Sequence, residues 1–182
     1  VGEVRGEEVG TLVQASAAGH GALTSFHTDS VQAMFTRLTS PPMEVKESFL
    51  DLIWAVAFLG FASPTRGERV ERRVFRVAET SMVEGNLLDR EVFQWDSDSD
   101  SFYPKSAVDV WAASDRLKQL ASLYNMDRET VLEEISRRER LIERAVHEGA
   151  IGFGDFKAAL RGFYSQRVKP SRRAGVEARE AY

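Results

Sequence analysis

The sequence contains no cysteine, and its 182 residues carry no excess of positive charge. The absence of cysteine excludes disulfide bonds, thiolate-ligated zinc sites and thiol nucleophiles. Lys and Arg total 24 against 28 Asp and Glu, which gives a formal net charge of -4. Such a composition offers no electrostatic footprint for nonspecific binding to nucleic acid or to an anionic membrane, so we expect no nucleic-acid partner.

Long hydrophobic runs are also absent. The most apolar stretch, FLDLIWAVAFLGF at residues 49–61, is too short to span a bilayer and contains Asp51, so we interpret it as buried core. With 43% apolar and 10% aromatic residues, the chain can bury one core and a small second one. The composition therefore predicts a folded protein.

The first part of the chain alternates between amphipathic stretches and short apolar runs, which is typical of α/β layers. The apolar spacing predicts a helix over residues 7–18 that ends at Gly19. A second helix is expected to begin at one of the capping candidates Thr28, Asp29 and Ser30, to run through Leu38, and to stop at Pro41-Pro42.

Strands are expected between and after these helices. ALTSF at residues 22–26 predicts a buried strand, and residues 52–59 predict another core strand. Residues 72–95 alternate around Gly85-Asn86, which predicts a β-hairpin, and DSDSDS at residues 96–101 predicts a polar turn.

From Ser106 onward the apolar period is helical. One stripe runs from Val108 to Leu123, a second helix is expected from Asp127 to Gly149, and Asp155 is a candidate cap for a third. These patterns predict an α/β part over residues 1–104, an all-helical subdomain over 105–168 and a flexible tail over 169–182.

Several short motifs follow one another in a specific order. They are Gly2-Glu3-Val4-Arg5, Gly19-His20, TSFHTDS at residues 24–30, Arg37-Leu38-Thr39 and Pro41-Pro42, and later REVFQWDSDSDSFYP and DRETVLEEISRRERLIE. Each motif alone is weak evidence, but the ordered series covers nearly the whole chain. It resembles the secretion ATPases of type II and type IV systems, and within them most closely the motor ATPases of archaella and archaeal type IV pili.

The resemblance implies a fold and an activity. The fold would be the C-terminal part of a RecA-like ATPase core with a β-hairpin, followed by a small all-helical C-terminal subdomain. The intact protein would be a homohexamer that hydrolyses ATP with Mg2+ in the cytoplasm, peripherally associated with the membrane. With an integral membrane platform protein, it would power a pilus-like filament, an archaellum or type II/IV secretion.

A phosphate-binding P-loop, G-x-x-x-x-G-K-[ST], is absent from these residues. The backbone cradle and the lysine that hold nucleotide phosphates are therefore missing from this chain. We expect the chain to begin inside the Walker B strand of a longer ATPase and to be inactive by itself.

The resemblance also implies roles for individual residues. Glu3, at the end of the Walker B motif, is expected to orient or polarise the attacking water. His27 is expected to donate to a terminal phosphate oxygen, while Arg5 either faces the phosphates or pairs with Glu7 or Glu8. The residues expected to bind the nucleotide are Gly2, Gly19, His20 and Thr24. The alternative for both histidines is a buried imidazole with satisfied hydrogen bonds.

Other kinds of site are less well supported by the sequence. His20, His27 and Asp29 do not have the helical spacing of a metal site, so none is predicted. Ser25, His27 and Asp29 do not form a hydrolase triad, because neighbouring strand residues point to opposite faces and no nucleophile elbow occurs.

The basic stretch RGERVERRVFR at residues 66–76 is interleaved with glutamates, so a solvated turn and strand edge is expected. In the family, basic side chains here could meet the nucleotide of an adjacent subunit. ASPTRG departs from the family's pattern, however, which leaves the roles of Arg66 and Arg69 open.

Two other functions remain alternatives. One is a non-catalytic interaction module, in which the helical part docks a membrane platform partner and the α/β part is a scaffold. The other is a bacterial-type secretion or conjugation ATPase, which is disfavoured because no tetracysteine zinc element occurs.

Overall fold

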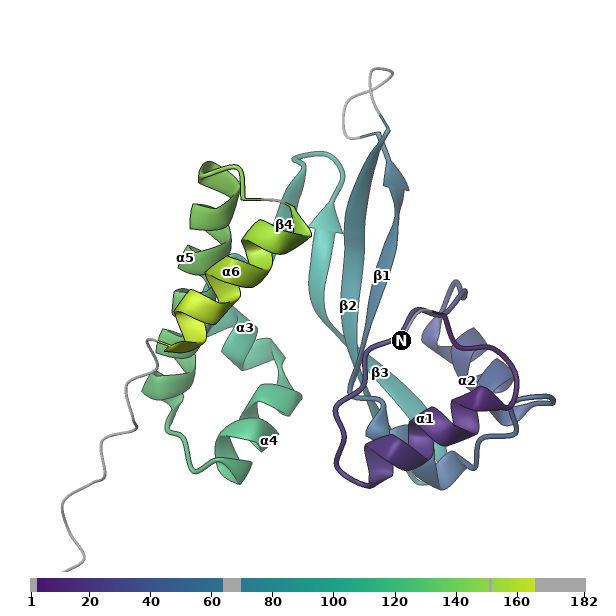
Figure 1. Cartoon of the computed structure of the whole chain (residues 1–182). Coiled ribbons are helices and arrows are strands. Elements are labelled where there is room, and N and C mark those ends of the chain that lie inside the picture. Colours follow the sequence, from purple (N-terminus) through teal and green to yellow (C-terminus); the bar gives the residue numbers. More distant parts are fainter. Residues whose placement is uncertain (1–2, 64–69, 151, 166–182) are drawn as a thin grey trace, which may run out of the picture. The chain divides into compact units, whose positions relative to one another are not determined.

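The computed structural model describes residues 3–63, 70–150 and 152–165 (Figure 1). It divides into two compact units, Val1–Leu132 and Glu133–Tyr182, which meet within helix α5. The elements in chain order are α1 (Glu8–Ala17), α2 (Val31–Thr39), the 3₁₀-helix η1 (Glu47–Leu52), β1 (Ala55–Ala62), β2 (Glu71–Val83), β3 (Asn86–Asp96), β4 (Ser101–Tyr103), α3 (Ala107–Ala113), α4 (Asp115–Leu123), α5 (Arg128–His147) and α6 (Phe153–Ser165). The predicted α/β class is confirmed. The RecA-like core and the predicted domain boundary near residue 104 stay predictions.

The two N-terminal helices confirm the predicted helices. After α1, Gly19 adopts a φ of 91°, a left-handed conformation that glycine reaches without strain. Of the three capping candidates for α2, Ser30 is the cap, and its hydroxyl accepts a hydrogen bond from the Ala33 N–H at 3.0 Å. The helix ends at Thr39, just before Pro41-Pro42.

The buried strand predicted at residues 22–26 is wrong. The backbone there makes a single isolated parallel bridge, between Ser25 and Glu3, and Leu23 is 88% exposed. Among the described residues this segment has no β-ladder longer than that one bridge. Only Phe26 packs against the core, because its neighbours have no partner layer to bury them.

A four-stranded antiparallel sheet in the order β1-β2-β3-β4 forms the middle of the first unit (Figure 1). The predicted hairpin is confirmed as β2 and β3. Glu84 and Gly85 in its turn have φ values of 50° and 79°, which match the twist that a tight hairpin requires. The polar turn at residues 97–100 is also confirmed, and it leads into β4.

The apolar run 49–61 is only partly buried core, so that interpretation needs correction. Its first part belongs to η1, where Leu50 is 1% exposed, and its second part is β1, where Leu59 and Phe61 are 70% and 67% exposed. Within the described residues β1 pairs only with β2, at the edge of the sheet. Alternate side chains of such a strand therefore face away from the core.

The core of the first unit joins its N-terminal helices to the sheet. Its buried residues are Val4, Val9, Val31, Met34, Leu38, Val45, Leu50 and Ala78. Because Val4 belongs to this cluster, the short segment that carries Glu3 and Arg5 is anchored by apolar burial.

The helical stripe expected from Val108 to Leu123 is broken at Ser114 into α3 and α4. The Ser114 hydroxyl accepts from the Leu117 N–H at 3.0 Å and donates to Glu79 of β2. The Glu79 carboxylate, which is 9% exposed, also accepts from the N–H groups of Asp115 and Arg116, at 2.9 and 3.0 Å. A buried acid on the sheet thus caps α4, and this contact explains the break.

The last two helices confirm one predicted cap and correct another. The Asp127 carboxylate accepts from the Thr130 N–H at 2.9 Å at the start of α5, and Gly149 beyond its end has a φ of 70°. Helix α6 begins at Phe153, so Asp155 lies in its first turn. The prediction that Asp155 caps this helix is therefore wrong. The tail 169–182 lies outside the described residues. No described helix has the length and apolar character needed to cross a membrane.

Candidate functional site

Residues 3–5 lie beside residues 25–27 in the first unit. The parallel bridge between Glu3 and Ser25 places residues 3–5 next to residues 25–27. The neighbouring Val4 is buried, and Gly6, with a φ of 64°, turns the chain into α1. Two stretches that are about twenty residues apart in the sequence therefore present their side chains to the same region.

Glu3 is the centre of a small charged group. The Arg5 guanidinium pairs with its Oε2, and the His27 Nε2 lies 3.5 Å from its Oε1. Because the two partners use different oxygens, both can contact the carboxylate together. The side chain of Glu3 is 23% exposed, whereas that of His27 is 81% exposed. His27 is therefore not the buried imidazole that was the alternative.

These contacts set the charge of Glu3. The hydrogen bond from Arg5 lowers the pKa of the Glu3 carboxyl below its ordinary value, partial burial opposes this, and the positive charges of Arg5, His27 and Arg37 lower it further. The carboxylate is thus ionised at neutral pH. An ionised carboxylate with these partners is a good hydrogen-bond acceptor but a weak base.

Arg37, which sequence reasoning quoted in a motif without giving it a role, completes the group. It lies in the last turn of α2, donates to the backbone carbonyl of His27, and places its guanidinium carbon 4.7 Å from the centroid of the Phe26 ring. The available signal was a basic residue at the end of the helix that follows TSFHTDS, residues 24–30. We call Glu3, Arg5, His27 and Arg37 the Glu3 cluster.

The structure places the remaining predicted residues less centrally. Gly19 and His20 are exposed beyond α1, and no hydrogen bond or ion pair in the described part of the chain joins His20 to Glu3. Thr24 is half-buried, and its hydroxyl lies 3.4 Å from the Ser25 carbonyl oxygen. Gly2, Arg66 and Arg69 lie outside the described residues.

The other kinds of site find no support in the geometry. Within residues 3–63, 70–150 and 152–165, no three His, Cys, Asp or Glu side chains are placed to hold a metal ion. His27 contacts Glu3 and Arg37, and among the described residues it has no hydrogen bond to Ser25 or Asp29.

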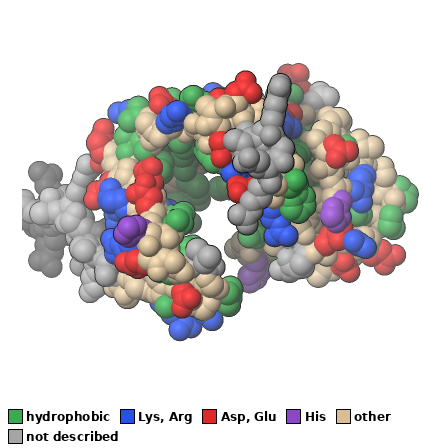
Figure 2. All heavy atoms as spheres, turned by 90° about the horizontal axis from the view of Figure 1, so that it is seen from above, with side chains coloured by type: hydrophobic (Ala, Val, Ile, Leu, Met, Phe, Trp, Pro, Cys, Tyr) green, Lys and Arg blue, Asp and Glu red, His purple; other side chains and the backbone are tan. Residues whose placement is uncertain are grey.

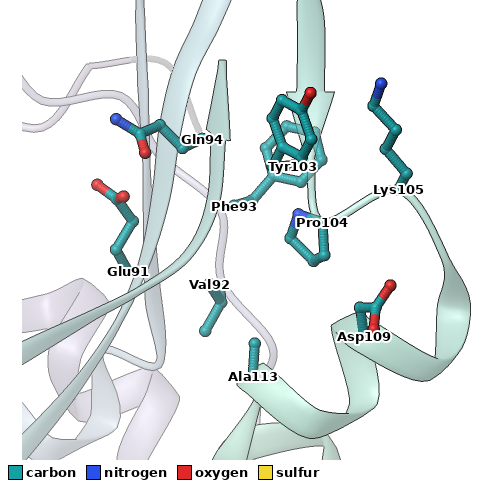
Figure 3. Close-up of a pocket in the computed structure, with 9 residues that line it drawn as sticks. All are labelled: Glu91, Val92, Phe93, Gln94, Tyr103, Pro104, Lys105, Asp109 and Ala113. Atoms are coloured by element: carbon teal, nitrogen blue, oxygen red, sulfur yellow. The ribbon is translucent and has the colours of Figure 1, made fainter. Parts of the chain in front are cut away.

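A separate pocket of about 590 Å³ lies between β3, β4 and α3 (Figure 3). Figure 3 shows Val92 of β3 and Ala113 of α3 pointing toward one another. Its lining residues are Glu91, Val92, Phe93, Gln94, Tyr103, Pro104, Lys105, Asp109 and Ala113. None of them belongs to the Glu3 cluster, and none was predicted as a site residue.

The molecular surface carries charges of both signs. Figure 2 shows acidic and basic side chains interspersed on the face that it displays. This agrees with the net charge of -4 and gives that face no field of a single sign.

Comparison with known proteins connects this site to a family. The family model described as type II/IV secretion system protein matches residues 1–83. This range includes the whole Glu3 cluster and ends with β2.

Two uncharacterized proteins of Methanocaldococcus jannaschii are similar to the chain. One is 27% identical over 175 residues, which cover 93% of this chain and 30% of that protein. The other is 26% identical over 143 residues, which cover 78% of this chain and 51% of that protein. The chain therefore spans about a third to a half of the length of these relatives. Residues 1–83 of this chain are therefore similar to type II/IV secretion system proteins.

Proposed function

We propose that this chain is part of a secretion-superfamily ATPase and that the Glu3 cluster contributes the water-orienting end of its hydrolytic site. The observation that carries the proposal is the ionised Glu3 carboxylate, held beside Arg5 and the exposed imidazole of His27. The family match over residues 1–83 supports it.

The residues of the cluster fit the terminal-phosphate end of a nucleotide. They combine one carboxylate acceptor, Glu3, with two donors that can be cationic, Arg5 and His27. Bound ATP with Mg2+ would supply the phosphoryl group and the metal charge that offsets its negative oxygens. The chain's sequence has no P-loop, so the cradle for the other phosphates belongs to another part of the protein.

Each residue then has a definite task. Glu3 accepts a hydrogen bond from the attacking water and orients it, because a carboxylate with a lowered pKa is better suited to orientation than to proton abstraction. Arg5 fixes the carboxylate through Oε2, and the imidazole of His27 donates to a terminal phosphate oxygen. Gly2, Gly19, His20 and Thr24 line the nucleotide in this proposal.

The finer part of the proposal follows the resemblance. The whole protein would be a homohexamer that works at the cytoplasmic face of the membrane with an integral membrane platform protein. It would drive a pilus-like filament or an archaellum. Similarity to two Methanocaldococcus jannaschii proteins supports the archaeal branch of the superfamily.

Turnover of ATP by the whole protein and by the 182-residue chain tests the proposal. We expect saturable, Mg2+-dependent hydrolysis by the whole protein and none by the chain alone, which has no P-loop to hold the β- and γ-phosphates. Saturable hydrolysis by the chain alone would refute the proposal that the site needs a P-loop from another part of the protein. Absence of turnover by the whole protein, with and without its membrane partner, would refute the ATPase.

A non-catalytic interaction module remains a second candidate because the second unit has an apolar groove. The groove, of about 410 Å³, is lined by Ile142, Ala145, Val146, Ala150, Phe153 and Phe156. Phe153 and Val146 are 85% and 63% exposed. Such a patch is typical of a surface that docks a partner. Filament assembly that survives Glu3→Gln but is abolished by Phe153→Asp would favour the module over the motor.

A further inference from the structure

Arg37 lies at the end of α2 and contacts the Glu3 cluster through the backbone of His27. Its described hydrogen bond does not go to the Glu3 carboxylate. Arg37 occupies the last turn of α2, next to the buried Leu38. Burial of Leu38 in the core fixes the phase of the helix, so the neighbouring Arg37 emerges at a defined position.

Two contacts join the Arg37 side chain to residues 26 and 27. Its Nη1 donates to the backbone carbonyl of His27, and its guanidinium carbon lies over the Phe26 ring, 4.7 Å from the centroid. Phe26 itself packs against the core. The guanidinium therefore holds two consecutive residues, and the ring that it covers is already anchored.

The imidazole of His27 has little else to define its position. Its side chain is 81% exposed, and its Nε2 reaches Glu3 at 3.5 Å, a long contact. Beyond His27, the Thr28 hydroxyl donates to the Ser30 carbonyl at 2.9 Å, which fixes the turn into α2. The direction of the imidazole thus depends on the backbone at residue 27, and Arg37 is the side chain bonded to that backbone.

We propose that Arg37 is a positioning residue, which clamps the backbone of His27 so that the imidazole stays beside Glu3. The inference rests on the proposed function. Arg37 would act through His27 and would leave nucleotide binding nearly unchanged. A lysine could keep the charge and one hydrogen bond but not the contact of a guanidinium with the Phe26 ring, so it should replace Arg37 only in part.

The first test does not depend on turnover. The 182-residue chain has three histidines, so selective labelling gives separate imidazole NMR signals for His20, His27 and His147. We expect Arg37→Ala to shift the His27 signals and to leave the other two in place, with Arg37→Lys between Arg37→Ala and the unmodified chain. Arg72→Ala is the matched control, because Arg72 also stacks on a ring, that of Phe61 at 5.5 Å, away from the cluster. Unchanged His27 signals in Arg37→Ala, under conditions where Glu3→Gln moves them, would overturn the proposal.

The second test is a double-mutant cycle for ATP turnover by the whole protein. Arg37→Ala should lower kcat roughly tenfold or more, with KM for ATP within about twofold, and should have no further effect once His27→Ala is present. Additive losses in the double variant would show that Arg37 does not act through His27. If Arg37→Ala fails to fold, Arg37→Lys takes its place in the cycle. Absence of turnover in the unmodified protein would refute the proposed function. The imidazole signals would still show whether Arg37 positions His27.

Discussion

The four-stranded sheet and the Glu3 cluster are built in opposite ways within the same unit. Strands β1, β2 and β3 pair along long ladders, each with one register shift, as from Ala55↔Glu79 to Ala62↔Glu71. The two segments of the cluster share one backbone bridge, Glu3↔Ser25, and are otherwise joined by side chains. Regular pairing gives the sheet its rigidity, whereas a site held by a few side chains can accept a ligand.

The same contrast appears in two carboxylates that both bind arginine. Asp100, in the turn before β4, accepts from Arg73 through both oxygens at 2.9 Å and from the Trp95 indole N–H at 2.8 Å. Its partners therefore belong to the sheet and its turn. Glu3 instead shares its carboxylate with His27, which is largely exposed. The Asp100 carboxylate is therefore fully engaged by side chains of the sheet, whereas the second partner of Glu3, His27, is open to solvent.

The largest loss of stability should come from the acid that caps α4. Glu79→Ala removes the acceptor of three hydrogen bonds at a buried position, so we expect the free energy of unfolding to fall by about 2–3 kcal/mol. Urea unfolding would measure it. The control is Asp89→Ala, which breaks an exposed pair with Arg76 at 3.3 Å and should cost less than about 1 kcal/mol. Equal losses of unfolding free energy in the two variants would contradict a special contribution of the Glu79 cap.

Glycines in the two regions give the next comparison. A Cβ added at Gly60 in β1 would lie 2.3 Å from a ring carbon of Phe75, whereas one added at Gly21, in the exposed segment after α1, would meet nothing within 4 Å. We expect Gly60→Ala to lower the free energy of unfolding by about 1–3 kcal/mol and Gly21→Ala to change it by less than about 0.5 kcal/mol. Thermal unfolding of both variants would show whether an added methyl group destabilises the sheet more than the exposed segment after α1.

His27→Ala should have a smaller effect on stability and a large one on activity. Because the side chain is 81% exposed, we expect the free energy of unfolding to stay within about 1 kcal/mol of the unmodified value. ATP hydrolysis and filament assembly should fall sharply. Melting and turnover measured on one preparation of the whole protein separate the two roles. A lowered melting temperature with normal specific activity would assign His27 to the structure.

The smallest effect is a dependence on pH in the sheet. Hydrogen bonds from Arg73 and then Trp95 lower the pKa of Asp100 from 3.8 to about 2. A lowered folded-state pKa gives stability that is present above the unfolded pKa and is lost as the pH falls toward the folded one. We therefore expect the Trp95 indole N–H signal of the folded protein to move with a midpoint near pH 2. Asp100→Asn should abolish this movement, and a movement that persists in that variant would have another cause.

Local patterns predicted the elements that depend on near neighbours. Local signals placed the end of the first helix at Gly19 and offered Ser30 as one of three caps for the second. They placed the hairpin turn at Gly85-Asn86, one residue after the observed turn at Glu84-Gly85. The break at Ser114 was missed because it depends on Glu79, 35 residues earlier in the chain, and no local period reports such a contact. Burial at Leu23 was overestimated because an apolar segment is buried only where a second layer covers it.

The candidate site was predictable in part. Glu3, Arg5 and His27 were named from the order of motifs, and the bridge with Ser25 places them together. Arg37 received no role, because its contact with His27 runs through a backbone carbonyl, which leaves no mark on residue type. The catalytic roles themselves stay predictions.

Glu3→Gln in the whole protein tests the central claim most directly, because it keeps the shape of the side chain and removes the charge that orients water. We expect the Kd for ATP to stay within about threefold and kcat to fall by roughly a hundredfold or more. The free energy of unfolding, measured on the same preparation, should stay close to the unmodified value, because ion pairs near the surface contribute little to stability. Unchanged turnover, or a loss of turnover fully explained by unfolding, would contradict the assignment of Glu3 to the hydrolytic site.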